Sequence, residues 1–88
     1  MKYRVVILKK AEKSIGELPL IARKRFILLL ADLQEKGPVQ PKYMNYSRIG
    51  DTTYHCHLDY HWVACWRCEK GKLYVEVYYV GSRENAPY

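Results

Sequence analysis

Apolar residues recur at two different periods along this chain, and each period predicts one kind of element. Over residues 20–36 the spacing is three and four, which lines one face of an amphipathic helix: Ala22, Phe26, Leu29, Leu30 and Leu33. Gly37 and Pro38 end this predicted helix. A shorter polar segment, residues 9–17, predicts another helical turn that ends near Pro19.

The other apolar runs predict strands. One β-branched run begins near the N-terminus and three follow in the second half of the chain, at residues 3–8, 52–58, 61–68 and 72–81. Short turns join the last three runs, so we expect them to pair in antiparallel fashion. The proline-containing segment 39–47 predicts a covering loop with a short strand around residues 46–49.

These elements predict an α+β fold in a single two-layer domain that spans residues 1–88. The N-terminal strand and two helices would pack on a mainly antiparallel sheet of about four strands. We expect the helices to cover one face of this sheet and to leave the other face open. On the last strand, alternation assigns Leu73, Val75, Val77 and Tyr79 to the covered face, and Tyr74, Glu76, Tyr78 and Val80 to the open one.

All three histidines lie within seven residues, at odd positions of one strand-like segment. Because successive side chains of a strand point to opposite faces, this segment would separate a polar face from an apolar one. The polar face would hold Thr53, His55, His57, Asp59 and His61. Histidine titrates near neutral pH, so this face is the first candidate for chemistry.

Spacing alone leaves three interpretations of the histidine face open. A metal site is one, because His-x-His places two imidazoles on one side of a strand. Same-face side chains are about 6.5–7 Å apart, however, so four ligands in a row span too much for one ion. Metal-free acid and base catalysis is another, with a turn at residues 58–60 bringing His57 and His61 to neighbouring positions on paired strands. The third is a plain polar face of a half-exposed sheet.

Composition narrows the class of partner. The formal net charge is +6, from 15 Lys and Arg against 9 Asp and Glu, which favours a polyanion or an acidic protein. The nine tyrosines and two tryptophans suit single-stranded nucleic acid, although such rings more often pack a sheet. No apolar segment is long enough for a signal peptide or a membrane span, so we expect a cytoplasmic protein with no membrane partner.

The three cysteines predict neither a disulfide framework nor a cofactor. Cys65 and Cys68 form a C-x-x-C motif, which is typical of zinc and redox sites. Residues three apart on a strand point to opposite faces, however. We therefore interpret the cysteines as buried thiols and expect no metal and no cofactor.

The C-terminal part carries the most specific motifs. They are Tyr54-His55-Cys56-His57-Leu58, Trp62-Val63-Ala64-Cys65-Trp66, Glu76-Val77-Tyr78-Tyr79-Val80-Gly81, Arg83 and Ala86-Pro87-Tyr88. In these motifs, and in the order of a strand, two helices and a strand meander, the chain resembles the RelE/ParE superfamily of toxins from bacterial type II toxin-antitoxin pairs. The resemblance is nearest to the RelE-like mRNA endonuclease branch. It implies a RelE-like fold and a metal-independent endoribonuclease that inhibits translation, acting on free mRNA or in the ribosomal A site, and an acidic cognate antitoxin that holds it inactive.

The resemblance also assigns roles to four catalytic candidates. His57 takes the place of a catalytic basic or histidine residue and would accept the proton of the attacking 2′-hydroxyl. His61, at a position where relatives vary, would protonate the leaving 5′-oxygen, so that a 2′,3′-cyclic or 3′-phosphate remains. Arg83 would hold the charge on the phosphate, and Tyr88 would stack on a base or assist proton transfer.

Three other residues are expected to bind RNA. His55 stands where relatives often have lysine or arginine, and Lys42 and Arg48 add positive charge before the strand meander. Two alternative functions stay open at this point. One is a non-enzymatic, ParE-like gyrase-binding toxin or an inactive relative, and the other is a metal-dependent hydrolase that uses the histidine strand.

Overall fold

The computed structural model describes residues 2–88, which form two α-helices, five strands and one 3₁₀ turn. Their bounds are β1 (Arg4–Ile7), α1 (Lys9–Ile15), α2 (Leu20–Lys36), β2 (Ser47–Arg48), β3 (Thr53–His57), β4 (Trp62–Arg67), β5 (Tyr74–Ser82) and η1 (Arg83–Asn85). The helix predicted over residues 20–36 is confirmed at both ends, and Gly37 stops it with a left-handed φ of 87°. Neither helix in residues 2–88 is long and apolar enough to cross a membrane.

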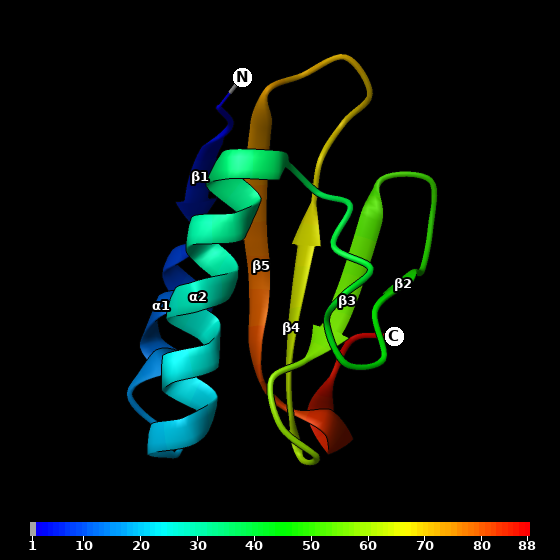
Figure 1. Ribbon diagram of the computed structural model, residues 1–88. Helices are drawn as coiled ribbons and strands as arrows, with labels where there is room; N and C mark the ends of the chain where they lie inside the picture. The colour runs from blue at the N-terminus through cyan, green and yellow to red at the C-terminus, as the bar shows by residue number, and fades with distance from the viewer. Residues whose placement is uncertain (1) are drawn as a thin grey trace.

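The strands form one mixed sheet in the order β1-β5-β4-β3-β2 (Figure 1). β1 runs parallel to β5, and the other neighbouring strands are antiparallel. The predicted α+β class is confirmed. The sheet has five strands rather than about four, because the N-terminal strand joins it beside β5 instead of lying in the covering layer.

Two helices and one loop cover the same face of the sheet. α1 and α2 lie over the β1 and β5 side, and the loop after α2 crosses in front of β4 and β3 (Figure 1). The buried Trp66 ring fixes this loop: it stacks on Tyr46 at 6.3 Å between centroids, and its Nε1–H donates to the Pro38 carbonyl at 3.0 Å. The core beneath contains Ala22, Phe26, Leu29, Leu33, Tyr54, Cys56, Ala64, Trp66, Val75, Val77 and Val80.

A bulge in β5 overturns part of the predicted face assignment. Cys65 of β4 lies opposite Tyr79, but the next residue of β4 lies opposite Val77, so Tyr78 has no counterpart. This extra residue resets the alternation of side chains along β5. Val80 consequently enters the core and Tyr79 turns to the other face, the reverse of our prediction, whereas Val77 lies where predicted.

We expected the sheet face opposite the helices to be open, but part of it is covered. The chain turns at η1 after β5 and ends beside β3 (Figure 1). There the Tyr88 ring packs on His55 with 4.3 Å between ring centroids. His55 and His57 are only 7% and 9% exposed. The chain's own C-terminal segment therefore covers part of the histidine face.

The two-layer packing predicts unequal effects at adjacent positions of α2. Phe26→Ala removes a buried ring and should lower the free energy of unfolding by about 3–5 kcal/mol. Ile27→Ala, at a position that is 59% exposed, should change it by less than about 0.5 kcal/mol. Urea unfolding followed by circular dichroism measures both values. Equal losses would contradict the orientation of α2.

Candidate active site

Two histidines of β3 share the sheet face that points away from the helices. His55 and His57 have ring centroids 5.8 Å apart, and Cys56 between them points into the core. Cys65 and Val63 of β4 lie directly opposite them. The predicted separation of a polar face from an apolar face along β3 is therefore present.

His55 is held on two sides. Its Nδ1 lies 3.0 Å from the Ser47 hydroxyl oxygen on β2, and the Tyr88 ring packs on the imidazole. Burial lowers the pKa of His55, and the charge of His57 lowers it further. The imidazole is thus favoured in its neutral form, in a fixed orientation.

His57 lines a hollow of about 480 Å³ with Met44, Asn45, Tyr60 and Arg83. Burial lowers the pKa of His57, and the Arg83 cation lowers it further because two positive charges repel each other. A neutral imidazole beside a permanent cation can accept a proton from one group while the cation attracts an anion.

The end of β5 positions Arg83. Gly81 lies opposite Val63, and a Cβ at position 81 would lie 2.8 Å from the Tyr79 hydroxyl oxygen, so a larger residue there would push the Tyr79 hydroxyl away from the Ser82 carbonyl to which it donates. Two residues later the Arg83 N–H donates to the His61 carbonyl at 2.8 Å. Its guanidinium carbon lies 5.0 Å from the Tyr60 ring centroid, which directs the side chain over the hollow.

Tyr88 supplies an aromatic ring at the edge of this site. The side chain is 51% exposed even though one side of its ring packs on His55. Burial is the main cause that raises the pKa of the Tyr88 hydroxyl, and the nearby Cys65 thiol adds to the rise. The hydroxyl therefore stays protonated at neutral pH and can donate a hydrogen bond.

The structure places His61 in the turn before β4 rather than opposite His57, whose cross-strand partner is Val63. The exposed His61 ring stacks on Tyr60 with 4.8 Å between centroids. The Tyr60 ring also contacts the Arg83 guanidinium and lines the hollow, so the Tyr60 ring separates His61 from the hollow. The predicted turn at residues 58–60 is present, but it does not make the two histidines direct cross-strand neighbours.

Lys42 and Arg48 do not lie in this hollow. The Lys42 ammonium pairs with Asp32 of α2 at 3.2 Å, on the helix side of the molecule. Arg48 lies opposite Tyr54, whose side chain enters the core, and donates to the Asp51 carbonyl at 2.6 Å. The structure therefore separates these two predicted RNA-binding residues from the histidines.

Residues 2–88 contain no group of three or more His, Cys, Asp or Glu side chains close enough to hold a metal ion. The C-x-x-C cysteines point to opposite sides of the sheet, since Cys68 belongs to the core cluster while Cys65 lies beside His55. Burial raises the pKa of Cys65 to about 12, so its thiol remains protonated.

Four residues of the site were not predicted from the sequence: Met44, Asn45 and Tyr60 line the hollow, and Ser47 contacts His55. Ser47 contacts His55 only because β2 pairs with β3. Tyr60 was not among the residues predicted for the polar face of the histidine segment, but the turn brings its ring to Arg83. No motif in the sequence marks these residues, because their positions depend on how the chain turns around β3.

Comparison of the sequence with protein-family models and with curated proteins gives no match. Solved structures do match. RelE from the archaeal RelE–RelB complex of Pyrococcus horikoshii has a TM-score of 0.76 and 21% identity, covering 98% of this chain and 100% of that chain. A mutant of Escherichia coli RelE in the free state has a TM-score of 0.74 and 20% identity, covering 98% of this chain and 88% of that chain. A chain of the E. coli DinJ–YafQ toxin-antitoxin complex has a TM-score of 0.73 and 9% identity, covering 100% of this chain and 100% of that chain.

The chain has the RelE fold. The predicted resemblance is thereby confirmed for the arrangement of the elements. In this chain the RelE fold brings the end of β3 and the segment after β5 together, so that His57 and Arg83 line one hollow.

The electrostatics of the hollow predict a selective change in one histidine. Arg83→Gln removes the cation beside His57, so the pKa of His57 should rise while that of His55 stays nearly constant. Arg48→Gln removes a cation from the other side of the sheet and should change neither. NMR titration of the imidazole protons measures both values in each variant. An unchanged His57 midpoint in Arg83→Gln would contradict the arrangement.

Proposed function

We propose that this protein is the toxin of a type II toxin-antitoxin pair and acts as a metal-independent mRNA endoribonuclease. The observation that supports this most directly is the hollow in which His57, with a lowered pKa, faces the permanent cation of Arg83. Cleavage of RNA by its own 2′-hydroxyl needs a base, an acid and a group that stabilises negative charge. The RelE fold, shared with toxins crystallised with RelB and DinJ, agrees with this class.

In the proposed reaction His57 accepts the proton of the 2′-hydroxyl. The O2′–P bond forms as the P–O5′ bond breaks, and the electron pair of that bond stays on O5′. Arg83 stabilises the extra negative charge on the phosphate oxygens during this exchange. The products are a 2′,3′-cyclic phosphate and a 5′-hydroxyl.

We assign the acid to His61, which gives its proton to O5′. His61 is exposed and stacks on the Tyr60 ring, which lines the hollow. His55 is buried and its pKa is lowered, which disfavours the protonated form that an acid needs. His55, which is buried beneath the Tyr88 ring, supports that ring, and the half-exposed Tyr88 ring stacks on a base.

The roles assigned to His57 and Arg83 predict a large loss of cleavage rate when either side chain is removed. His57→Ala should slow cleavage by about 10²–10⁴-fold, the usual contribution of a positioned base. Arg83→Ala should slow it by about 10²–10³-fold, as expected for loss of transition-state charge stabilisation. Both are measured as cleavage of free mRNA in excess chelator and of ribosome-bound mRNA in magnesium buffer, and mass spectrometry identifies the cyclic phosphate.

Lys24→Ala is the matched control, because it removes an exposed cation from α2 and should retain full activity. Parent-like rates in both site variants would overturn the residue assignment. Loss of the parent's activity on free mRNA when chelator is added would favour the metal-dependent alternative. DNA damage without mRNA cleavage in arrested cells would favour gyrase binding.

The acid assignment predicts rescue by a better leaving group. In RNA with sulfur in place of the bridging O5′, the departing thiolate needs no proton. His61→Ala should cleave this RNA at nearly the parental rate while cutting ordinary RNA slowly, and His57→Ala should remain slow on both. Rescue of His55→Ala instead of His61→Ala would transfer the acid role to His55.

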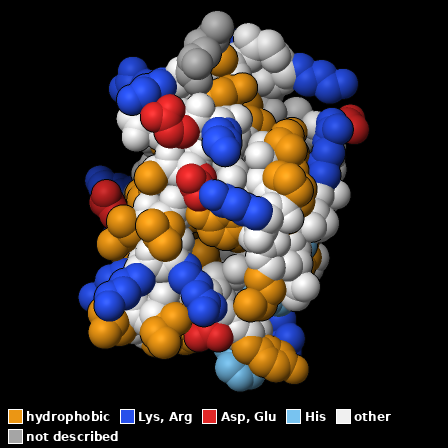
Figure 2. Space-filling view, viewed as in Figure 1, with side chains coloured by type: hydrophobic (Ala, Val, Ile, Leu, Met, Phe, Trp, Pro, Cys, Tyr) orange, Lys and Arg blue, Asp and Glu red, His pale blue; other side chains and the backbone are white. Residues whose placement is uncertain are grey.

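We extend the proposal to an acidic antitoxin as partner. The net charge is +6, and Lys and Arg side chains are spread over the helix side of the molecule among exposed apolar residues of α2 such as Leu20 and Leu28 (Figure 2). A partner with acidic and apolar side chains would match this surface.

Binding of such a partner to the folded chain should raise its unfolding temperature with increasing partner concentration. The candidate to test is a small acidic protein encoded beside this chain. Thermal unfolding of the mixture measures the effect, and 1 M salt should weaken it by screening. No shift at low salt and no inhibition of RNA cleavage would exclude that candidate.

A further inference from the structure

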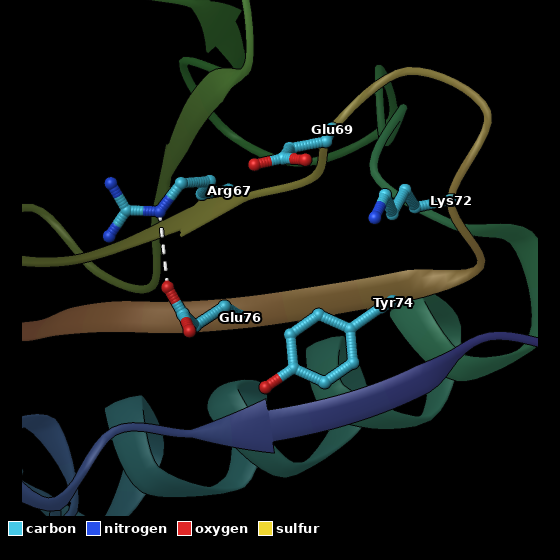
Figure 3. A pocket seen from close by; sticks show the side chains of 5 residues that line it. All are labelled: Arg67, Glu69, Lys72, Tyr74 and Glu76. Atoms are coloured by element: carbon cyan, nitrogen blue, oxygen red, sulfur yellow. Dashed lines mark hydrogen bonds and ion pairs between the residues drawn. The ribbon is translucent and has the colours of Figure 1, made fainter.

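A second hollow lies at the opposite end of the sheet face that carries the histidines. It has a volume of about 630 Å³ and is lined by Arg67, Glu69, Lys72, Tyr74 and Glu76, at the ends of β4 and β5 that the hairpin joins (Figure 3). The proposed reaction does not use this hollow or any residue in it.

Arg67 is fixed beside this hollow by two different contacts. Its Nε donates to Glu76 Oε1 at 3.1 Å, and its guanidinium carbon lies 4.7 Å from the Tyr78 ring centroid. Among residues 2–88, no hydrogen bond occupies its two terminal nitrogens. A guanidinium held in this way offers a planar pair of donors in a defined direction, which matches a phosphodiester.

Tyr74 provides an exposed aromatic ring in the same hollow. It is 40% exposed and lines the hollow with its neighbour Glu76 (Figure 3). The four charged residues of the hollow balance one another, two cations against two carboxylates: Arg67, Lys72, Glu69 and Glu76. Because the charges of these four lining residues sum to zero, a flat uncharged ring with polar edges fits the hollow better than a cluster of phosphates does.

Strand register connects this hollow to the histidines. Cys65 lies directly opposite His55, and Arg67 is two residues further along β4 on the same face. Diagonal neighbours on paired strands are about 7–8 Å apart. His57, which lines the reacting hollow, lies opposite Val63, and Arg67 is four residues further along β4 on the same face, about 13 Å away. An extended strand that starts at the reacting hollow would therefore reach Arg67 beyond the nucleotide next to the cleaved bond.

We propose that this hollow is a nucleotide subsite of the RNA substrate. Arg67 binds a phosphate further along the strand than the one that is cleaved, Tyr74 stacks on the attached base, and Glu76 orients Arg67. The inference rests on the proposed function and adds to it a binding position beyond the cleaved bond.

The test pairs changes in the protein with changes in the RNA. The probe is a fluorescent RNA with a single 2′-deoxy residue at the cleavage site, which prevents cutting, and with one base at a time removed around that site. Tyr74→Ala should weaken binding of the intact strand by about 5- to 150-fold, which corresponds to ~1–3 kcal/mol per stacked base. Tyr74→Phe keeps the ring and should bind like the parent.

The decisive readout is the position of the effect. Removal of one particular base should weaken RNA binding by the parent protein. With the strand that lacks this base, and with no other, Tyr74→Ala should bind as well as the parent does. Arg67→Lys keeps the charge but lacks the planar fork, so it should also weaken binding. Leu73→Ala alters an exposed neighbour outside the hollow and serves as the control. Circular dichroism confirms that each variant is folded.

Parent-like binding by both Tyr74→Ala and Arg67→Lys would overturn the subsite while leaving the proposed function intact. An equal loss in Tyr74→Ala at every base-free position would also overturn it. If the parent binds none of these strands, either free or on ribosomes programmed with them, the proposed function fails and the subsite fails with it.

Discussion

The one-residue bulge in β5 is the constraint on which the arrangement of the site depends. β4 and β5 are in register at Cys65 and Tyr79, and the unmatched Tyr78 shifts every pair beyond it. This shift puts Val80 into the core, and it leaves Gly81 opposite the residue that pairs with His57. Without the extra residue, alternation would turn Val80 to solvent and direct the segment after β5 differently. Core packing and site geometry are thus fixed by the same irregularity.

The site combines neutral imidazoles with one permanent cation. Burial disfavours the charged form of both His55 and His57, and Arg83 adds repulsion at His57. Part of that burial comes from Tyr88, which packs on His55 from the end of the chain. The proton-accepting character of the strand is therefore created by tertiary contacts. The spacing of the histidines alone does not produce it.

Local signals explain which features were predictable from the sequence. The helix over residues 20–36 was predicted correctly because its period and its glycine stop both lie within the segment. The shared face of His55 and His57 followed from strand alternation. Tyr79 was misassigned because the bulge is defined by pairing with β4, which alternation within β5 cannot report. Ser47 was missed for the same kind of reason, since its contact with His55 needs the β2–β3 pairing.

The edge strand β2 affects how far β3 can pair with another chain. β2 is only two residues long, but backbone hydrogen bonds on either side of it occupy further polar groups along the same edge of β3. The Ile49 N–H donates to the Thr53 carbonyl at 2.9 Å, and the His57 N–H donates to the Met44 carbonyl at 2.8 Å. Unpaired strand edges are templates for aggregation. Here the polar groups at both ends of β3 are already occupied, so the strand that carries the histidines is closed to intermolecular sheet growth.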